Sequence, residues 1–246
     1  MKDHPQPSRR SFLAALPVVT AGLAAPPAAH AAGARAQPHW GLLVDTRRCI
    51  GCQACTMACA IENALPEGQF RTSVATYAVA AADGRVTVAM VPRTCNHCDE
   101  PPCIPVCPVG ATFKRDDGIV LVDGDKCVGC AYCVQACPYD ARFINHETGK
   151  ADKCTFCSHR VEAGLLPACV ETCVGGARVF GDLDDPASEI RRRLQAAQGR
   201  TSVLKPEVAS KPNVFYIGLD PDLDGRVDAE SATDLTWRPG RRAHGA

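Results

Sequence analysis

Cysteine is the residue type through which this chain could do chemistry, because 16 of its 246 residues are cysteines. Thiolates are soft ligands that suit zinc and iron–sulfur clusters, and in an oxidising compartment they also form disulfides. The cysteines fall into four groups of four that leave none over. In chain order the groups are Cys49, Cys52, Cys55 and Cys59; Cys95, Cys98, Cys103 and Cys107; Cys127, Cys130, Cys133 and Cys137; and Cys154, Cys157, Cys169 and Cys173.

The spacing within the groups indicates which ligand chemistry they serve. The first and third groups are C-x2-C-x2-C-x3-C, the bacterial ferredoxin run, in which three thiolates hold one [4Fe–4S] cluster and the fourth ligates a neighbouring cluster. Two residues between thiolates let a tight loop wrap one cube, and three residues begin a helical turn that points the last thiolate away. The second and fourth groups have longer middle spacings but also end in C-x3-C. We therefore expect four [4Fe–4S] clusters held by all sixteen cysteines.

Two other uses of cysteine compete with this interpretation. An even cysteine count in an exported chain could form disulfides, but disulfide frameworks do not usually repeat C-x2-C-x2-C-x3-C. Zinc ribbons use C-x2-C pairs, with four ligands in two pairs and not in triplets. A zinc module would be colourless and would contain no labile sulfide. The repeated triplets favour iron–sulfur clusters over both alternatives.

An internal repeat indicates the elements that must position these cysteines. The segments that follow the last cysteine of three groups align with one another, at residues 107–113, 137–143 and 173–179. Each has glycine or aspartate at its fourth position, which suits a turn that leaves a short cysteine helix. Each then has an alanine that would pack close to a cluster, and a Phe or Val that would begin a strand. The predicted unit is a cysteine loop, a short helix and a hairpin.

Further strands and a helix are predicted around this repeat. Short strand pairs are expected at 112–114 with 119–122, and at 142–145 with 150–152. Alternation about Ala82-Asp83-Gly84 predicts an inserted hairpin made of 72–79 and 86–91. Beyond the fourth group, Pro186 favours a helix at 187–198, and a strand is expected at 214–217.

These elements predict an α+β fold made of two bacterial-ferredoxin-like modules in tandem, each with two [4Fe–4S] clusters. The four-cluster core is expected to span residues 40–181, with the inserted hairpin at about 70–92. Residues 182–246 are expected to form a C-terminal extension, a helix plus a strand, that docks a partner. A chain of this length is enough for such a core.

The first 31 residues have the pattern of a twin-arginine signal peptide. Arg9-Arg10 precedes an apolar run at 12–25, and Ala29-His30-Ala31 is a small-x-small cleavage site. The apolar run is too short to span a bilayer. Because this route exports folded proteins, it suits a chain whose clusters are inserted in the cytoplasm. We expect a periplasmic protein that is associated with the membrane through a partner.

Charge and polar residues suggest no second chemistry. Lys plus Arg equals Asp plus Glu at 27 each, so bulk charge does not suggest nucleic acid. The histidines that could bear on a site, His97, His146 and His159, lack a convincing nucleophile or metal partner and are expected to form hydrogen bonds or lie at the surface. Four basic residues lie next to or near the start of a cysteine group: Arg48, Arg93, Lys126 and Lys153. They are either ordinary surface charges or residues that raise the reduction potential of a cluster.

Together, the motifs resemble those of the four-cluster beta subunits of molybdopterin oxidoreductases. The resemblance covers most of the chain beyond the signal peptide and rests on residues 48–53, 95–99, 127–147, 152–157 and 214–219. It implies a non-catalytic electron-transfer subunit with no small-molecule substrate of its own. An integral-membrane quinol-oxidising subunit would supply electrons, and a molybdopterin catalytic alpha subunit would receive them.

Within the family, the resemblance is greatest to members that serve tetrathionate reduction. The alternative is the same role in a polysulfide or thiosulfate reductase, a nitrite reductase or an exported hydrogenase complex. A structural or sensory iron–sulfur protein without a redox partner is an alternative of another class, and it would be a soluble monomer with a polar surface.

The resemblance also implies how the cysteine groups cross-pair. Some relatives have a tryptophan at the position of Cys130 and build a [3Fe–4S] cluster there, so the cysteine implies four full clusters. In the family the first pair of clusters faces the catalytic subunit and the second pair faces the membrane subunit. The implied ligand sets are Cys49, Cys52, Cys55 with Cys173; Cys154, Cys157, Cys169 with Cys59; Cys95, Cys98, Cys103 with Cys137; and Cys127, Cys130, Cys133 with Cys107.

Overall fold

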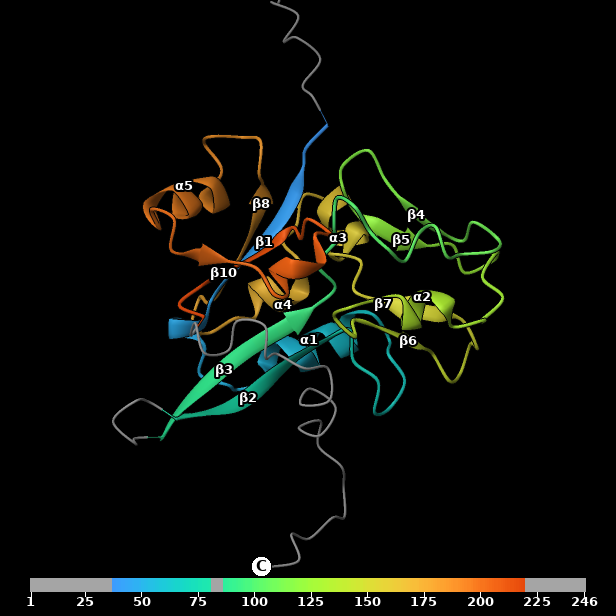
Figure 1. Cartoon of the computed structure of the whole chain (residues 1–246), viewed down its shortest axis with the longest axis horizontal. Helices are drawn as coiled ribbons and strands as arrows, with labels where there is room; N and C mark the ends of the chain where they lie inside the picture. The colour runs from blue at the N-terminus through green and yellow to red at the C-terminus, as the bar shows by residue number, and fades with distance from the viewer. Residues whose placement is uncertain (1–36, 81–85, 220–246) are drawn as a thin grey trace, which may run out of the picture. The chain divides into compact units, whose positions relative to one another are not determined.

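The computed structural model describes residues 37–80 and 86–219 (Figure 1). The predicted signal peptide, the predicted turn at Ala82-Asp83-Gly84 and the end of the chain from residue 220 lie outside the described residues. The described part contains short helices and short strands, which is compatible with the predicted α+β class. None of its helices is both long enough and apolar enough to cross a bilayer.

A four-stranded sheet joins the two ends of the described chain. Strand β1 (Trp40–Asp45) pairs antiparallel with β8 (Arg178–Asp182) on one side and parallel with β10 (Val214–Ile217) on the other (Figure 1). Strand β9 (Thr201–Ser202) pairs with β10 and forms the far edge. The predicted strand at 214–217 has the observed bounds. Because β10 pairs with β1, the chain beyond residue 181 belongs to the same sheet as the first strand of the predicted core.

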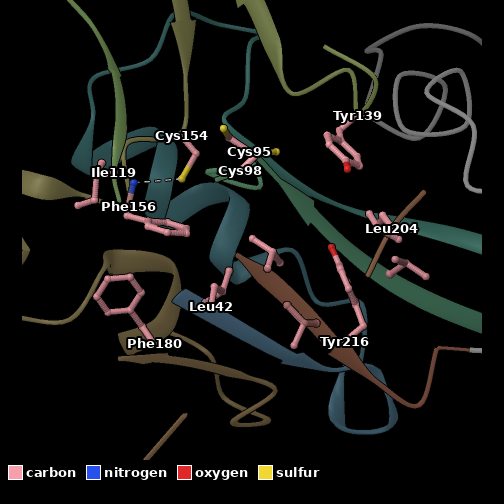
Figure 2. Close-up of a cluster of buried hydrophobic side chains, with 13 residues drawn as sticks. Leu42, Cys95, Cys98, Ile119, Tyr139, Cys154, Phe156, Phe180, Leu204 and Tyr216 are labelled. Atoms are coloured by element: carbon pink, nitrogen blue, oxygen red, sulfur yellow. Dashed lines mark hydrogen bonds between the residues drawn. The ribbon is translucent and has the colours of Figure 1, made fainter. Parts of the chain in front are cut away.

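Both faces of this sheet are buried. Leu42 and Val44 of β1 pack on one face with Tyr216 of β10, in the largest apolar cluster (Figure 2). Leu43 points to the other face, where it packs with Ile190. A strand that is buried on two faces is a continuous apolar run and not an alternating one.

Helix α5 (Glu189–Ala196) covers the second face and carries Ile190, which is fully buried. The helix is shorter than the predicted 187–198. It begins after Ser188, whose side-chain oxygen accepts a hydrogen bond from the Arg191 amide at 3.2 Å. This N-cap sets the start of the helix, so Pro186 and Ala187 belong to the preceding turn.

Three two-stranded units complete the strand inventory of the described chain. The longest pairs β2 (Thr72–Ala80) with β3 (Val86–Thr94) antiparallel, with Thr72 opposite Thr94. Strand β4 (Thr112–Lys114) pairs with β5 (Val120–Val122), as predicted apart from one residue at the start of β5. Strand β6 (Arg142–Ile144) pairs with β7 (Ala151–Lys153), one residue from the predicted bounds.

Short helices contain or directly follow cysteines of three of the four groups. They are α1 (Ala54–Glu62), α2 (Tyr132–Gln135), α3 (Ser158–Glu162) and α4 (Ala168–Glu171), and two 3-10 turns lie at η2 (Thr46–Arg48) and η3 (Pro206–Val208). Helix α1 continues past Cys59, which is followed by Ala60. Proline follows the last cysteine in the second and third groups, where it cannot continue a helix.

Candidate metal centres

The four cysteine loops share one backbone device. The residue two positions after the first cysteine of each group has a positive φ: Gly51 (69°), His97 (43°), Gly129 (72°) and Phe156 (51°). A left-handed residue turns the chain sharply, so the first two cysteines of each group face the same side. Glycine adopts this conformation at no cost, whereas His97 and Phe156 adopt it against their side-chain preference.

The first three cysteines of group one meet the last cysteine of group four. Cys49, Cys52, Cys55 and Cys173 line one cavity. The wall of this cavity is tight, because a Cβ atom added at Gly175 would collide with the carbonyl oxygen of Arg48. Only glycine therefore allows the chain after Cys173 to approach the loop of group one.

A second cavity repeats this arrangement with other groups. It is lined by Cys95, Cys98 and Cys103 of group two and by Cys137, the last cysteine of group three. Burial raises the pKa of the Cys98 thiol to about 12, and negative charge on the other three cysteines of the cavity acts in the same direction. The four sulfur atoms are thus close enough to influence one another electrostatically.

Cys59 meets the first three cysteines of group four. Its pKa is raised mainly by burial, and then by negative charge on Cys154, Cys169 and Cys157. The side-chain amide of Asn63 lies 3.6 Å from the Cys59 sulfur and 4.0 Å from the Cys157 sulfur, so it reaches both groups. This set brings α1 against the fourth group.

The remaining cysteines are gathered less completely. Cys127 and Cys133 are buried in one apolar cluster, and Cys107 packs against the same cluster. Cys130 is exposed, as is Cys52. Within residues 37–80 and 86–219, no three His, Cys, Asp or Glu side chains converge on a point as the ligands of one metal ion would. A [4Fe–4S] cluster separates its ligands, because each thiolate binds a different iron at a corner of the cube.

Backbone amides point at several of the sulfur atoms. The amide of Ala111 donates to Cys107 Sγ at 3.1 Å, and the amide of Ala177 donates to Cys173 Sγ at 3.3 Å. Both alanines stand four residues after the last cysteine of a group, at the repeat position where an alanine is predicted to pack close to a cluster. Such donors stabilise negative sulfur and tune a cluster that is bound to it.

Two buried arginines contact the cysteine sets, and neither is among the basic residues singled out from the sequence. Arg142 Nη2 lies 3.0 Å from Cys103 Sγ, and Arg178 Nη1 lies 3.7 Å from Cys169 Sγ. Each arginine stands five residues after the last cysteine of its group. The repeat therefore contained the signal that could have found them.

The same two arginines make equivalent polar contacts. Arg178 donates to the Thr72 hydroxyl at 2.8 Å, and Arg142 donates to the Thr112 hydroxyl at 3.2 Å. Burial lowers the pKa of Arg178, but negative charge on Cys169 and Cys55 outweighs burial and raises the pKa overall. Each arginine is thus a buried cation held beside two cysteine sets.

The basic residues predicted from the sequence divide into two kinds. Arg48 and Lys126 are exposed, and Lys126 pairs with Asp123 at 2.9 Å. Arg93 and Lys153 are buried, and Arg93 donates to the carbonyl oxygen of Tyr139 at 3.0 Å. Proximity to a cysteine in sequence does not distinguish the two kinds.

The three histidines singled out from the sequence lie in different environments. His97 is fully buried, and its Nδ1 accepts a hydrogen bond from the Val120 amide at 3.0 Å. His159 lies at the surface 2.8 Å from the carboxylate of Glu62, and His146 is exposed. Burial lowers the pKa of His97 well below its usual range, and the positive charge of Lys153 acts in the same direction.

Comparison with known families shows that the chain is an iron–sulfur protein. Two families described as 4Fe-4S dicluster domains match the chain, one over residues 48–111 and the other over residues 86–183. The chain therefore contains ferredoxin-like [4Fe–4S] domains in tandem.

Similar proteins are subunits of reductases. A tetrathionate reductase subunit of Salmonella typhimurium is 58% identical over 222 residues, 87% of this chain and 89% of the relative. The corresponding tetrathionate reductase subunit of Archaeoglobus fulgidus is 48% identical over 72% of this chain and 81% of the relative. A thiosulfate reductase electron transfer subunit of Salmonella typhi is 48% identical over 67% of this chain and 90% of the relative. The chain belongs to the family of iron–sulfur beta subunits of molybdopterin oxidoreductases.

Proposed function

We propose that this chain is a non-catalytic subunit whose sixteen cysteines hold four [4Fe–4S] clusters, which supply one-electron redox chemistry when bound. The observation that carries the proposal is the pair of cavities, each lined by three cysteines of one group and the last cysteine of another. In the ferredoxin run, the last cysteine likewise ligates the neighbouring cluster and not the cluster of its own triplet. The proposed first module uses Cys49, Cys52, Cys55 with Cys173, and Cys154, Cys157, Cys169 with Cys59; the second module uses Cys95, Cys98, Cys103 with Cys137, and Cys127, Cys130, Cys133 with Cys107.

The protein's own contribution is to hold anionic sulfur in a buried place. Burial raises the pKa of the Cys169 thiol to about 12 and that of the Cys137 thiol to about 11, so bare thiols there stay protonated at neutral pH. Ligand thiols must lose their protons when metal binds. The thiolate sulfur atoms that result are anionic. Positive charge near them comes from Arg142 and Arg178, and hydrogen bonds come from backbone amides.

We propose tetrathionate as the terminal acceptor of the complex. The catalytic partner would add two electrons to tetrathionate, break its central sulfur–sulfur bond and release two thiosulfate ions. The 58% identity to a tetrathionate reductase subunit over most of both chains supports this choice. Thiosulfate reduction is the second candidate, supported by the 48% identity to a thiosulfate reductase subunit. A polysulfide, nitrite or hydrogenase complex would use the same electron carrier.

The proposed partners are a molybdopterin catalytic subunit and an integral-membrane subunit that oxidises quinol. Exposed apolar side chains stand near the exposed cysteine of each proposed module in the sequence, and such side chains suit contact with partners. Ile50 lines the cavity of Cys52, and Val174 directly follows Cys173, which lines the same cavity. Val128 and Tyr132 stand two residues before and after Cys130. The pattern Arg9-Arg10 supports export by the twin-arginine route, which would place the assembled complex in the periplasm.

Purification of the complex from its native membrane, without oxygen, tests the proposal. We expect about sixteen irons and as much labile sulfide per chain, together with a co-purifying molybdenum subunit. Reduced viologen should then be oxidised by tetrathionate. A preparation with far fewer irons contradicts the four-cluster proposal. A complex that reduces other sulfur oxyanions but never tetrathionate contradicts the choice of acceptor.

A further inference from the structure

Lys153 is a cation buried where the two proposed modules meet. It is the last residue of β7, immediately before Cys154, and it is only 1% exposed. Its ammonium donates to the carbonyl oxygen of Cys154 at 2.7 Å and to the carbonyl oxygen of Val120. Cys154 belongs to the proposed first module, whereas Val120 lies on β5 in the second. One side chain therefore connects the backbones of both modules.

The hydrogen-bond partners of Lys153 do not neutralise its charge. Both are backbone carbonyls, which carry no net charge. The adjacent carboxylate of Asp152 is bound by Arg71, whose Nε lies 2.7 Å from Oδ1. A buried ammonium without a countercharge is costly, so a fold that keeps one requires a negative partner nearby.

In the proposed cluster-bound chain, ligand sulfur atoms of two different quartets provide that negative partner. Burial lowers the pKa of Lys153, and the positive charge of Arg142 acts in the same direction. Negative charge on Cys95, Cys154 and Cys103 opposes this lowering without reversing it. Cys154 belongs to the quartet completed by Cys59, whereas Cys95 and Cys103 belong to the quartet completed by Cys137. Cys154 and Cys95 belong to the same buried cluster (Figure 2). Burial raises the pKa of Cys154, and negative charge on Cys95 acts in the same direction. A [4Fe–4S] cluster with four thiolates is an anion, which completes the charge balance.

We propose that the positive charge of Lys153 sets the electron step between the two modules by raising the reduction potentials of both clusters at the junction. These are the cluster of Cys59, Cys154, Cys157 and Cys169 and the cluster of Cys95, Cys98, Cys103 and Cys137. The proposal rests on the four-cluster function above. A cation stabilises an electron that is added to a neighbouring site, and the stabilisation is large where water is excluded. Arg142 and Arg178 act within one module each, whereas Lys153 acts across the boundary.

The chain offers a matched control for this residue. Lys126 stands immediately before Cys127, just as Lys153 stands immediately before Cys154. The Lys126 side chain is 64% exposed and pairs with Asp123, so water and a carboxylate screen its charge. If burial at the junction is what matters, neutralising Lys126 should change little.

The experiment is a redox titration, monitored by electron paramagnetic resonance, of the purified complex with K153M or K126M. Signals of the junction clusters are assigned with C59S and C137S, each of which removes one ligand from one junction quartet. With K153M, we expect the ratio of reduced to oxidised cluster at fixed potential to fall about tenfold at both junction clusters, which is about 59 mV for one electron. With K126M, all ratios should stay within about twofold of the unaltered complex. Equal shifts in the two variants, or a K153M shift confined to the outer clusters, would overturn the proposal.

Iron content separates the possible failures. An unaltered complex without iron contradicts the proposed function itself, whereas an iron-replete K153M complex with unchanged potentials contradicts only the role of Lys153. If K153M assembles with less iron than the unaltered complex, K153R takes its place. This variant keeps the positive charge. A ratio of reduced to oxidised cluster that stays within about twofold of the unaltered complex at both junction clusters supports the proposal. A tenfold fall in an iron-replete K153R complex contradicts it.

Discussion

The imidazole ring of His97 stacks on the phenyl ring of Phe156, with centroids 3.7 Å apart and planes inclined by 23°. Both residues stand two positions after the first cysteine of their group, where the other two groups have Gly51 and Gly129. The two groups that replace glycine with a ring thus meet ring to ring. The backbone is left-handed at both residues, with φ of 43° at His97 and 51° at Phe156. The packing of the two rings compensates for this strain.

This relationship predicts an unusual order of stability for substitutions at Phe156. The ring is 2% exposed, and it also meets Phe180 edge to face with centroids 5.3 Å apart. F156A should therefore cost about 3–5 kcal/mol through lost packing. F156G loses the same ring but relieves the positive φ, which costs an L-residue about 1 kcal/mol. We expect F156G to melt no lower than F156A in the iron-loaded chain.

The control for this prediction is Phe113 of β4, which is 40% exposed. F113A should lower the melting temperature far less than F156A, because less ring area leaves water on folding. Also, F113G should melt below F113A, since residue 113 is in a strand and glycine weakens strands. An F156G chain that melts clearly below F156A would show that the backbone at Phe156 is not strained.

The buried arginines predict a loss of stability when their charge is removed. Arg178 is 4% exposed and contacts Cys169 and Thr72 through its guanidinium. R178M keeps most of the side-chain volume but leaves buried negative sulfur without its cation, so it should destabilise the cluster-loaded chain by about 3–5 kcal/mol. Thermal unfolding followed by loss of cluster absorbance measures this effect.

An exposed arginine serves as the control. Arg192 pairs with Glu189 one turn away on α5, and both side chains are about half exposed. Such a pair contributes little, so R192M should change stability by at most about 0.5 kcal/mol. Similar losses in R178M and R192M would argue that the Arg178 charge is not needed by the sulfur atoms.

The proposed crossed ligation predicts that two similar substitutions damage different clusters. Cys173 lines the cavity of Cys49, Cys52 and Cys55. In contrast, the pKa of Cys59 is raised by burial and then by negative charge on three cysteines of group four, so Cys59 lies near that group. C173S should therefore perturb the cluster of group one, and C59S the cluster of group four. Each substitution removes the last thiolate of one group, and each should lower the iron count by no more than about one cluster.

The paramagnetic resonance spectra of the two variants measure this prediction, because each should lose or shift a different signal. Spectra of C173S in which the damage is confined to the cluster of Cys154, Cys157 and Cys169 would show that each group holds its own cluster. The unaltered chain, with all signals present, provides the reference.

How far the sequence predicts this fold depends on the range of each interaction. Strand β4 and strand β10 have the predicted bounds, because their signals are local: a turn directly follows β4, and β10 is a run of β-branched and aromatic residues. Strand β1 was not predicted, since it is buried on both faces and its pattern does not alternate. Its parallel pairing with β10, Leu42 opposite Val214, joins distant parts of the chain and leaves no local signal.

The site divides in the same way. Spacing indicates which three cysteines act together, because a short loop brings them together by itself. The partner for each triplet depends on tertiary packing, as in the approach of Cys173 to Cys49, and came only from the family resemblance. The basic residues singled out from the sequence lie next to or near the start of a cysteine group. Arg142 and Arg178 were not among them, because each stands five residues after the last cysteine of its group. A comparison of charge at each aligned position of the repeat would have indicated them.

Tyr139 predicts a pH dependence at the alkaline end. Its hydroxyl pairs with Ser210 at 2.7 Å, and burial raises its pKa to about 12 from the ordinary value of 10.0. Because the folded-state pKa is higher, this group's stabilisation is fully present below pH 10 and is lost as the pH rises toward 12. At pH 8 the unaltered chain should be more stable than Y139F by about 1 kcal/mol, the contribution of one buried hydrogen bond. Melting temperatures of both chains between pH 8 and pH 11 should show this gap narrowing above pH 10, while the remaining tyrosines, common to both chains, cancel. A gap that stays constant or widens with pH would show that Tyr139 ionises as readily in the folded chain as in the unfolded one.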